Sequence, residues 1–127
     1  MTTGESAKVL KYRLAEASLP ADADPLTRAH VVRHLGDAYR EAGRLSDAEP
    51  CYIEALAIYR ANDRTARLDL ANAVRPLAIL REAQGALAEA GTLFEEARRL
   101  YAESGVPAGV AEMAEHLGEV VRHRTDS

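Results

Sequence analysis

Apolar residues recur at three- and four-residue steps through most of the chain, with charged residues between them, and this is the spacing of one buried face of an α-helix. The clearest stretch places Val31, Val32, Leu35, Ala38 and Tyr39 on one side of such a helix. No stretch convincingly predicts a strand. The pattern therefore predicts about six helices, over about residues 5–18, 25–42, 46–61, 65–84, 87–103 and 107–123.

Glycine and proline mark the ends of these predicted helices. Asp24 followed by Pro25 is a typical start, because aspartate caps a helix and a proline at the first position loses no hydrogen bond. Gly43 and Gly85 each stand in a short turn, so the helices on either side of each glycine are expected to pair as an antiparallel hairpin. The chain is thus predicted to consist of helix hairpins in a single domain over residues 1–127.

Pro76 falls inside the predicted helix over residues 65–84, where a proline is unfavourable. It has no N–H to donate to the carbonyl of Asn72, and the expected result is a kink. Two interpretations remain open: the kink contributes to the curvature of the fold, or it frees the Asn72 carbonyl for a ligand.

The two hairpins repeat each other at a fixed spacing of 42 residues. The matched pairs include Leu35 and Leu77, Gly43 and Gly85, Ala48 and Ala90, Tyr52 and Phe94, and Tyr59 and Tyr101. A third, partial copy is His116-Leu117-Gly118-Glu119, which matches His34-Leu35-Gly36-Asp37. Repetition of this kind predicts an all-α fold in which hairpins stack side by side as an α-solenoid.

The repeated residues resemble the tetratricopeptide repeat. The first helix meets the pattern of a large residue, Leu-Gly and an aromatic residue with Val32-x2-Leu35-Gly36-x2-Tyr39. The second helix meets it with Ala48-x3-Tyr52. Valine stands where the family has tryptophan, and the 42-residue spacing resembles the long repeats of kinesin light chains. The resemblance implies a right-handed superhelix of antiparallel hairpins.

In the family that this chain resembles, the first helix of each hairpin lines a concave groove that holds a peptide. The resemblance therefore implies a scaffold that binds a protein or peptide partner. The residues implied to contact the partner are Arg33, Asp37, Arg40, Asn72, Arg75, Ile79, Glu82, Glu115, Glu119 and Arg122. Two alternatives remain open. Arg33 and Asp37 are also spaced as an exposed helix pair worth about 0.2–0.5 kcal/mol, and the chain could instead be a self-association module that forms a homo-oligomer.

Charge and composition disfavour other classes of partner. The net charge of −4, from 16 Lys and Arg against 20 Asp and Glu, creates no field that would attract nucleic acid or an anionic membrane. No apolar run approaches the roughly 18 residues of a membrane span, and no basic segment followed by an apolar one opens the sequence. Cys51 has no second cysteine to pair with and is expected to be a small buried residue in a reducing compartment. The expectation is a cytoplasmic protein without nucleic-acid or membrane partners.

Candidate catalytic or metal-binding groups are few. His30 and His34 lie four residues apart and could supply two metal ligands, but no cysteine or carboxylate is spaced to complete a tetrahedral site. The sequence contains no glycine-rich phosphate loop after a strand, no Gly-x-Ser-x-Gly elbow and no Cys–His spacing typical of a nucleophile. We therefore expect neither an enzyme nor a cofactor or metal site.

The last predicted helix has an apolar side that carries Met113 and Leu117 and an opposite side rich in glutamate. Terminal repeats need a polar outer surface, so this helix is expected to cap the stack. Met113 and Leu117 are expected to pack around Phe94 and Tyr101, and the Leu117→Ala substitution is expected to cost about 2–5 kcal/mol.

Overall fold

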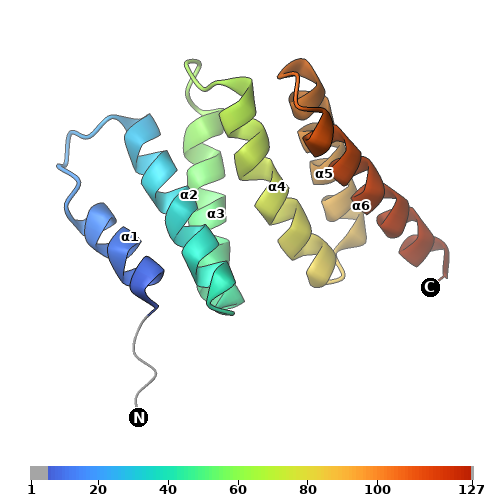
Figure 1. The fold of residues 1–127 in the computed structure, drawn as a ribbon, viewed down its shortest axis with the longest axis horizontal. Coiled ribbons are helices and arrows are strands. Elements are labelled where there is room, and N and C mark those ends of the chain that lie inside the picture. Colours follow the sequence, from blue (N-terminus) through green and yellow to red (C-terminus); the bar gives the residue numbers. More distant parts are fainter. Residues whose placement is uncertain (1–5, 127) are drawn as a thin grey trace, which may run out of the picture. The chain divides into compact units, whose positions relative to one another are not determined.

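The computed structural model describes residues 6–126, with side chains as far as residue 124, and contains six α-helices and no strand in that range (Figure 1). The helices are α1 (Ala7–Ala17), α2 (Pro25–Glu41), α3 (Leu45–Arg60), α4 (Arg67–Ala83), α5 (Leu87–Glu103) and α6 (Pro107–Asp126). Their bounds lie within a few residues of the predicted ones, and the all-α helical-repeat class is confirmed. The first residue predicted to be helical, Glu5, lies outside the described residues.

The chain divides into two compact units, one up to Asp63 with α1, α2 and α3, and one from Arg64 onward with α4, α5 and α6. In the first unit, α2 packs against both α1 and α3. In the second unit, α5 packs against both α4 and α6. That the whole chain acts as a single domain stays a prediction.

Three turns of the same kind join consecutive helices within the units. Gly43, Gly85 and Gly105 adopt φ angles of 78°, 78° and 71°, in the left-handed region that favours glycine. At the start of α2, Oδ1 of Asp24 accepts a hydrogen bond from the backbone N–H of Leu26 at 2.9 Å, and proline occupies the first turn. The predicted turns at Gly43 and Gly85 and the predicted start of α2 are thereby confirmed.

The core of the first unit forms where α2 meets its two neighbours. The buried residues Val9, Leu35 and Ala38 lie together, and three partly buried residues pack against them: Tyr12, Tyr39 and Cys51. Gly36 lets α3 approach α2 closely, because a Cβ atom at this position would lie only 2.8 Å from Cε1 of Tyr52. A larger residue here would push the two helices apart.

The core of the second unit includes Phe94 of α5. Phe94 is fully buried, and its ring stacks on the imidazole of His116 in α6, with the ring centroids 4.5 Å apart and the planes 7° apart. Met113 is fully buried as well, and its packing around Phe94 and Tyr101 stays a prediction. Leu117 is only half-buried, so it is less enclosed than a core residue, and its packing around Phe94 and Tyr101 stays a prediction. Its truncation to alanine is therefore expected to cost less than the predicted range.

Two prolines lie inside helices. Pro76 is buried within α4, which runs unbroken from Arg67 to Ala83 around it. Pro50 lies inside α3 in the same way, and the sequence pattern did not single it out. Each helix therefore tolerates the loss of one backbone donor, and at Pro76 this donor is the one that would reach the Asn72 carbonyl.

Candidate functional site

Nine of the ten residues predicted to bind a partner occupy equivalent positions on α2, α4 and α6, and Asn72 lies on α4 outside these sets. These helices begin at Pro25, Arg67 and Pro107, and counting from their starts gives one register for all three. The equivalent sets are Arg33, Arg75 and Glu115; Asp37, Ile79 and Glu119; and Arg40, Glu82 and Arg122. Successive sets are three or four residues apart, so in each helix they lie on one face.

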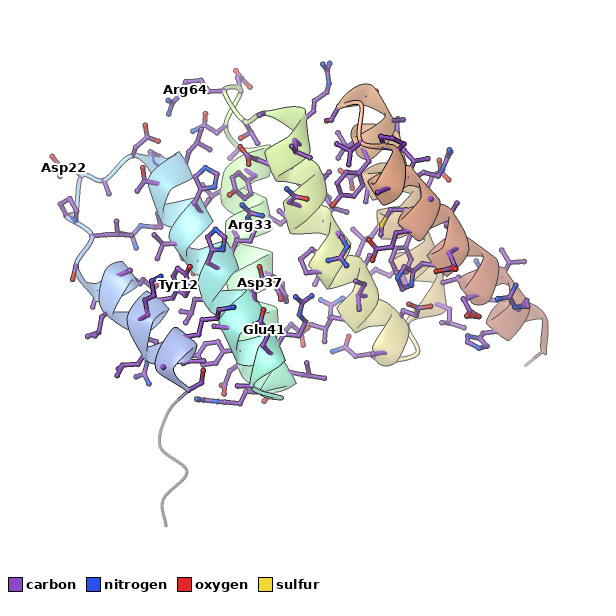
Figure 2. All side chains as sticks on the ribbon, viewed as in Figure 1. Tyr12, Asp22, Arg33, Asp37, Glu41 and Arg64 are labelled. Carbon is purple, nitrogen blue, oxygen red and sulfur yellow. The ribbon has the colours of Figure 1, made fainter. Side chains whose placement is uncertain are left out.

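On α2, Arg33, Asp37 and Glu41 follow one another at intervals of about one turn (Figure 2). Asp37 is engaged within the fold, since its Oδ1 accepts a hydrogen bond from the Tyr52 hydroxyl at 2.8 Å and lies 3.6 Å from Nη2 of Arg40. Burial and the hydrogen bond to Asp37 raise the pKa of Tyr52, so its hydroxyl stays protonated and remains a donor. Asp37 therefore joins α2 to α3.

Arg75 and Arg33 occupy equivalent positions but differ in their partners. Nε of Arg75 donates to the two carboxylate oxygens of Glu112 at 2.9 and 3.1 Å, and Nη2 donates to Oε2 at 2.6 Å. The hydrogen bonds from Arg75 hold the pKa of Glu112 below its ordinary value. Nε of Arg33 is buried and has no hydrogen-bond partner among the residues that the structure describes. Arg33 therefore has a buried donor that no described residue satisfies.

A second polar contact joins α4 to α6. Oε1 of Glu82 lies 2.9 Å from Nδ1 of His116, and Nε2 of the same imidazole lies 3.8 Å from Oε2 of Glu112. Arg75 and Glu82, both predicted to bind a partner, thus hold two helices of one unit together. Glu112 and His116 were not among the residues predicted to bind a partner, although their four-residue spacing on one helix was an available signal.

The other predicted residues of the second unit lie in different surroundings. Oδ1 of Asn72 accepts a hydrogen bond from the Tyr101 hydroxyl at 2.7 Å. Ile79 is half-buried, and Glu115 is exposed. Nη2 of Arg122 donates to Oε1 of Glu119 at 2.6 Å, and this exposed pair lowers the pKa of Glu119. These residues present a surface of mixed charge.

Comparison with known proteins identifies the repeat. The family model of the tetratricopeptide repeat matches residues 26–103, which is more than half of the chain. The chain belongs to the tetratricopeptide-repeat family. No curated protein and no solved structure matches it. The match covers two full tetratricopeptide repeats, α2 with α3 and α4 with α5, and leaves α1 and α6 outside.

One hydrogen bond recurs at the same place in both tetratricopeptide repeats. The Tyr59 hydroxyl lies 2.5 Å from Nδ1 of His30, and 42 residues further along the chain the Tyr101 hydroxyl donates to Asn72. The rings of Tyr59 and His30 also meet edge to face. His30, one of the two histidines considered as metal ligands, is thus engaged in packing α2 against α3.

Two kinds of reactive group can be examined in the described residues, clusters of metal ligands and the single thiol. Among the described residues, no group of three or more His, Cys, Asp or Glu side chains could hold a metal ion. Cys51 is half-buried, and burial raises the pKa of its thiol to about 11. Little of the nucleophilic thiolate is therefore present at neutral pH.

No described helix is long and apolar enough to cross a membrane.

Proposed function

We propose that this tetratricopeptide-repeat protein is a scaffold without catalytic activity that binds an acidic peptide segment of a partner protein at Arg33 on α2. The family supports protein binding in general. The unsatisfied Nε of Arg33 supports binding at this particular face of α2. Arg40 follows Arg33 two turns further along the same face and offers a second guanidinium group to an acidic peptide, while Asp37 between them is already bonded to Tyr52.

The proposal rests on a difference between two equivalent arginines, since Arg75 is paired with Glu112 and Nε of Arg33 has no partner among the described residues. A guanidinium group recognises a carboxylate through parallel hydrogen bonds, and Arg75 does this with Glu112. A buried donor that has no partner costs about 1–3 kcal/mol. A carboxylate of the partner, from Asp, Glu or a chain end, would take at Arg33 the place that Glu112 takes at Arg75.

A selection from a random-sequence peptide library on the purified chain tests the proposal. The enriched peptides should contain acidic residues, and the Arg33→Gln substitution should weaken their binding by roughly 10- to 100-fold, the effect of one charged hydrogen bond. Arg99→Gln is the matched control, because it removes the same charge from an exposed position on α5. Equal affinity of the wild-type and Arg33→Gln chains would show that the peptide binds elsewhere.

Self-association is the second candidate function, and exposed apolar residues on α6 favour it. Val121 is 62% exposed, and Ala111 and Ala114 are exposed as well. Light scattering at increasing protein concentration distinguishes the two candidates, since a strict monomer excludes self-association.

Two finer features belong to the same proposal. The 42-residue spacing supports the long-repeat subtype found in kinesin light chains. The lone Cys51, half-buried and without a second cysteine to pair with, supports a cytoplasmic location.

A further inference from the structure

One face of α6 is uncovered where the equivalent face of α2 is buried. The α6 residues are Ala111, Ala114, Leu117 and Gly118, and their equivalents in α2 are Ala29, Val32, Leu35 and Gly36. All four α2 residues are buried, whereas the two alanines of α6 are exposed and Leu117 and Gly118 are half-buried. The difference arises because α3 packs on α2, and no described helix plays the part of α3 for α6.

The open face of α6 consists of Ala111, Ala114, Leu117, Gly118 and Val121. Gly118 leaves room at its centre, because a Cβ atom there would meet nothing closer than Nη1 of Arg122 at 3.7 Å. In α2 the space beside the equivalent Gly36 is filled by the ring of Tyr52. An apolar cavity of about 380 Å³ adjoins the start of this face, lined by Ala102, Gly105, Val106, Pro107, Val110 and Ala111.

A complementary face lies on α1. The open face of α1 consists of Ala7, Leu10, Leu14 and Ala17, all exposed, with Leu10 at 47% and Leu14 at 58%. It is turned away from Val9, which is buried in the contact with α2. Its residues follow each other at steps of three, four and three, and Ala111, Ala114, Gly118 and Val121 follow each other at the same steps. Both faces thus have the spacing of a helix-pairing seam.

We propose that the open face of α6 in one copy of the chain packs against the open face of α1 in a second copy, as an antiparallel helix pair. One register aligns all four positions of the two seams. It places Leu10 against Gly118 and Leu14 against Ala114, so that each large side chain meets a small one. It also places Ala7 against Val121 at one end and Ala17 against Ala111 at the other.

Charge favours this pairing over either helix with its own copy. The charged residues of α1 are mostly basic: Lys8, Lys11 and Arg13 against Glu16. Among the described side chains of α6, three are acidic, Glu112, Glu115 and Glu119, and two are basic, Arg122 and Arg124. The antiparallel register puts Lys11 beside Glu115, whereas pairing α1 with α1 would oppose Lys11 to itself and pairing α6 with α6 would oppose Glu115 to itself. An interface between unlike faces joins copies head to tail.

The test uses two variants that each lose one of the faces. One carries Leu10→Glu with Leu14→Glu on α1, and the other carries Ala114→Glu with Val121→Glu on α6. All four positions are exposed, so circular dichroism should show an unchanged helix content for both variants. The mass of the wild-type chain in sedimentation or light scattering should rise with concentration. Association of each variant alone should be weaker by about tenfold or more. An equimolar mixture of the two should form a one-to-one dimer, because each variant retains the face that the other lacks.

Three results would overturn the proposal: a wild-type chain that stays monomeric at millimolar concentration, an α1 variant that still dimerises alone, or a mixture that stays monomeric. The second result would point to α6 pairing with α6. If the glutamate variants fail to fold, the charge pair gives an independent test. Lys11→Glu and Glu115→Lys should each weaken association, and the chain that carries both should recover it. Failure to recover would contradict the antiparallel register.

Discussion

The two tetratricopeptide repeats share a backbone plan but differ in one layer of the contact between their helices. Near the end of the second helix, a tyrosine hydroxyl contacts the first helix in both repeats, from Tyr59 to His30 and from Tyr101 to Asn72. Two turns earlier in the second helix, the first repeat pairs Tyr52 with Asp37 through a hydrogen bond, and the second repeat has Phe94 and Ile79 at the equivalent positions.

The difference shows which part of the contact is fixed by geometry and which by chemistry. An aromatic ring occupies the position in both repeats, because the short turn and the small residues opposite leave a space of that size. Whether the ring carries a hydroxyl depends on the first helix, since a buried hydroxyl requires an acceptor and Asp37 provides one. Ile79 offers no acceptor, and Phe94 needs none.

The largest expected effect comes from emptying this position in the second repeat. Phe94 is fully buried and stacks on His116, so Phe94→Ala should lower the free energy of unfolding by about 3–5 kcal/mol. Urea titration followed by circular dichroism measures the change. Thr92→Ala, at an exposed position of the same helix, is the control and should change the stability little. A loss below about 1 kcal/mol would mean that α5 and α6 close over the cavity.

The second prediction concerns the small residue beneath the ring. Gly36→Ala should destabilise the first repeat by about 1–3 kcal/mol, because the new methyl group would lie 2.8 Å from the buried Tyr52 ring. That cost exceeds the roughly 1 kcal/mol that alanine gains over glycine inside a helix. Gly91→Ala is the matched control on α5, where a new Cβ atom would meet nothing closer than Cγ1 of Val120 at 3.6 Å, and it should stabilise the chain. Thermal unfolding of both variants compares them, and a stabilised Gly36→Ala chain would contradict the close approach of α2 and α3.

The smallest effect should come from converting the polar layer into the apolar one. Tyr52→Phe removes the hydroxyl that donates to the Asp37 carboxylate and should cost about 1 kcal/mol. Adding Asp37→Ile reproduces the chemistry of the second repeat and should recover most of that loss. A double-mutant cycle in urea measures the coupling. Independent, additive effects of the two substitutions would show that the hydrogen bond contributes nothing to the pairing of α2 with α3.

The sequence predicted the helices and turns well because their signals are local. Pro25 after Asp24 and the glycines at 43 and 85 act through their own backbone geometry, so no knowledge of the packing was needed. The family followed from the spacing of small and aromatic residues within each hairpin.

The partners of the predicted site residues could not be obtained in that way. Arg75 meets Glu112, and Glu82 meets His116, across a distance of more than thirty residues in the chain. Which of two equivalent arginines finds a carboxylate depends on how α6 packs, and the helical pattern of α4 carries no information about that. The half-buried state of Leu117 could not be predicted for the same reason, since its burial depends on a covering helix rather than on its own periodicity.

The reactivity of Cys51 can be used to measure local opening of the first repeat. Its thiol donates a hydrogen bond to the Asp47 carbonyl at 3.6 Å, and its raised pKa suppresses the thiolate at neutral pH. Alkylation of this single thiol should therefore be slow while α2 and α3 stay together and should accelerate when they separate. The rate of labelling would then report how often this hairpin opens in the folded chain, without unfolding the second repeat.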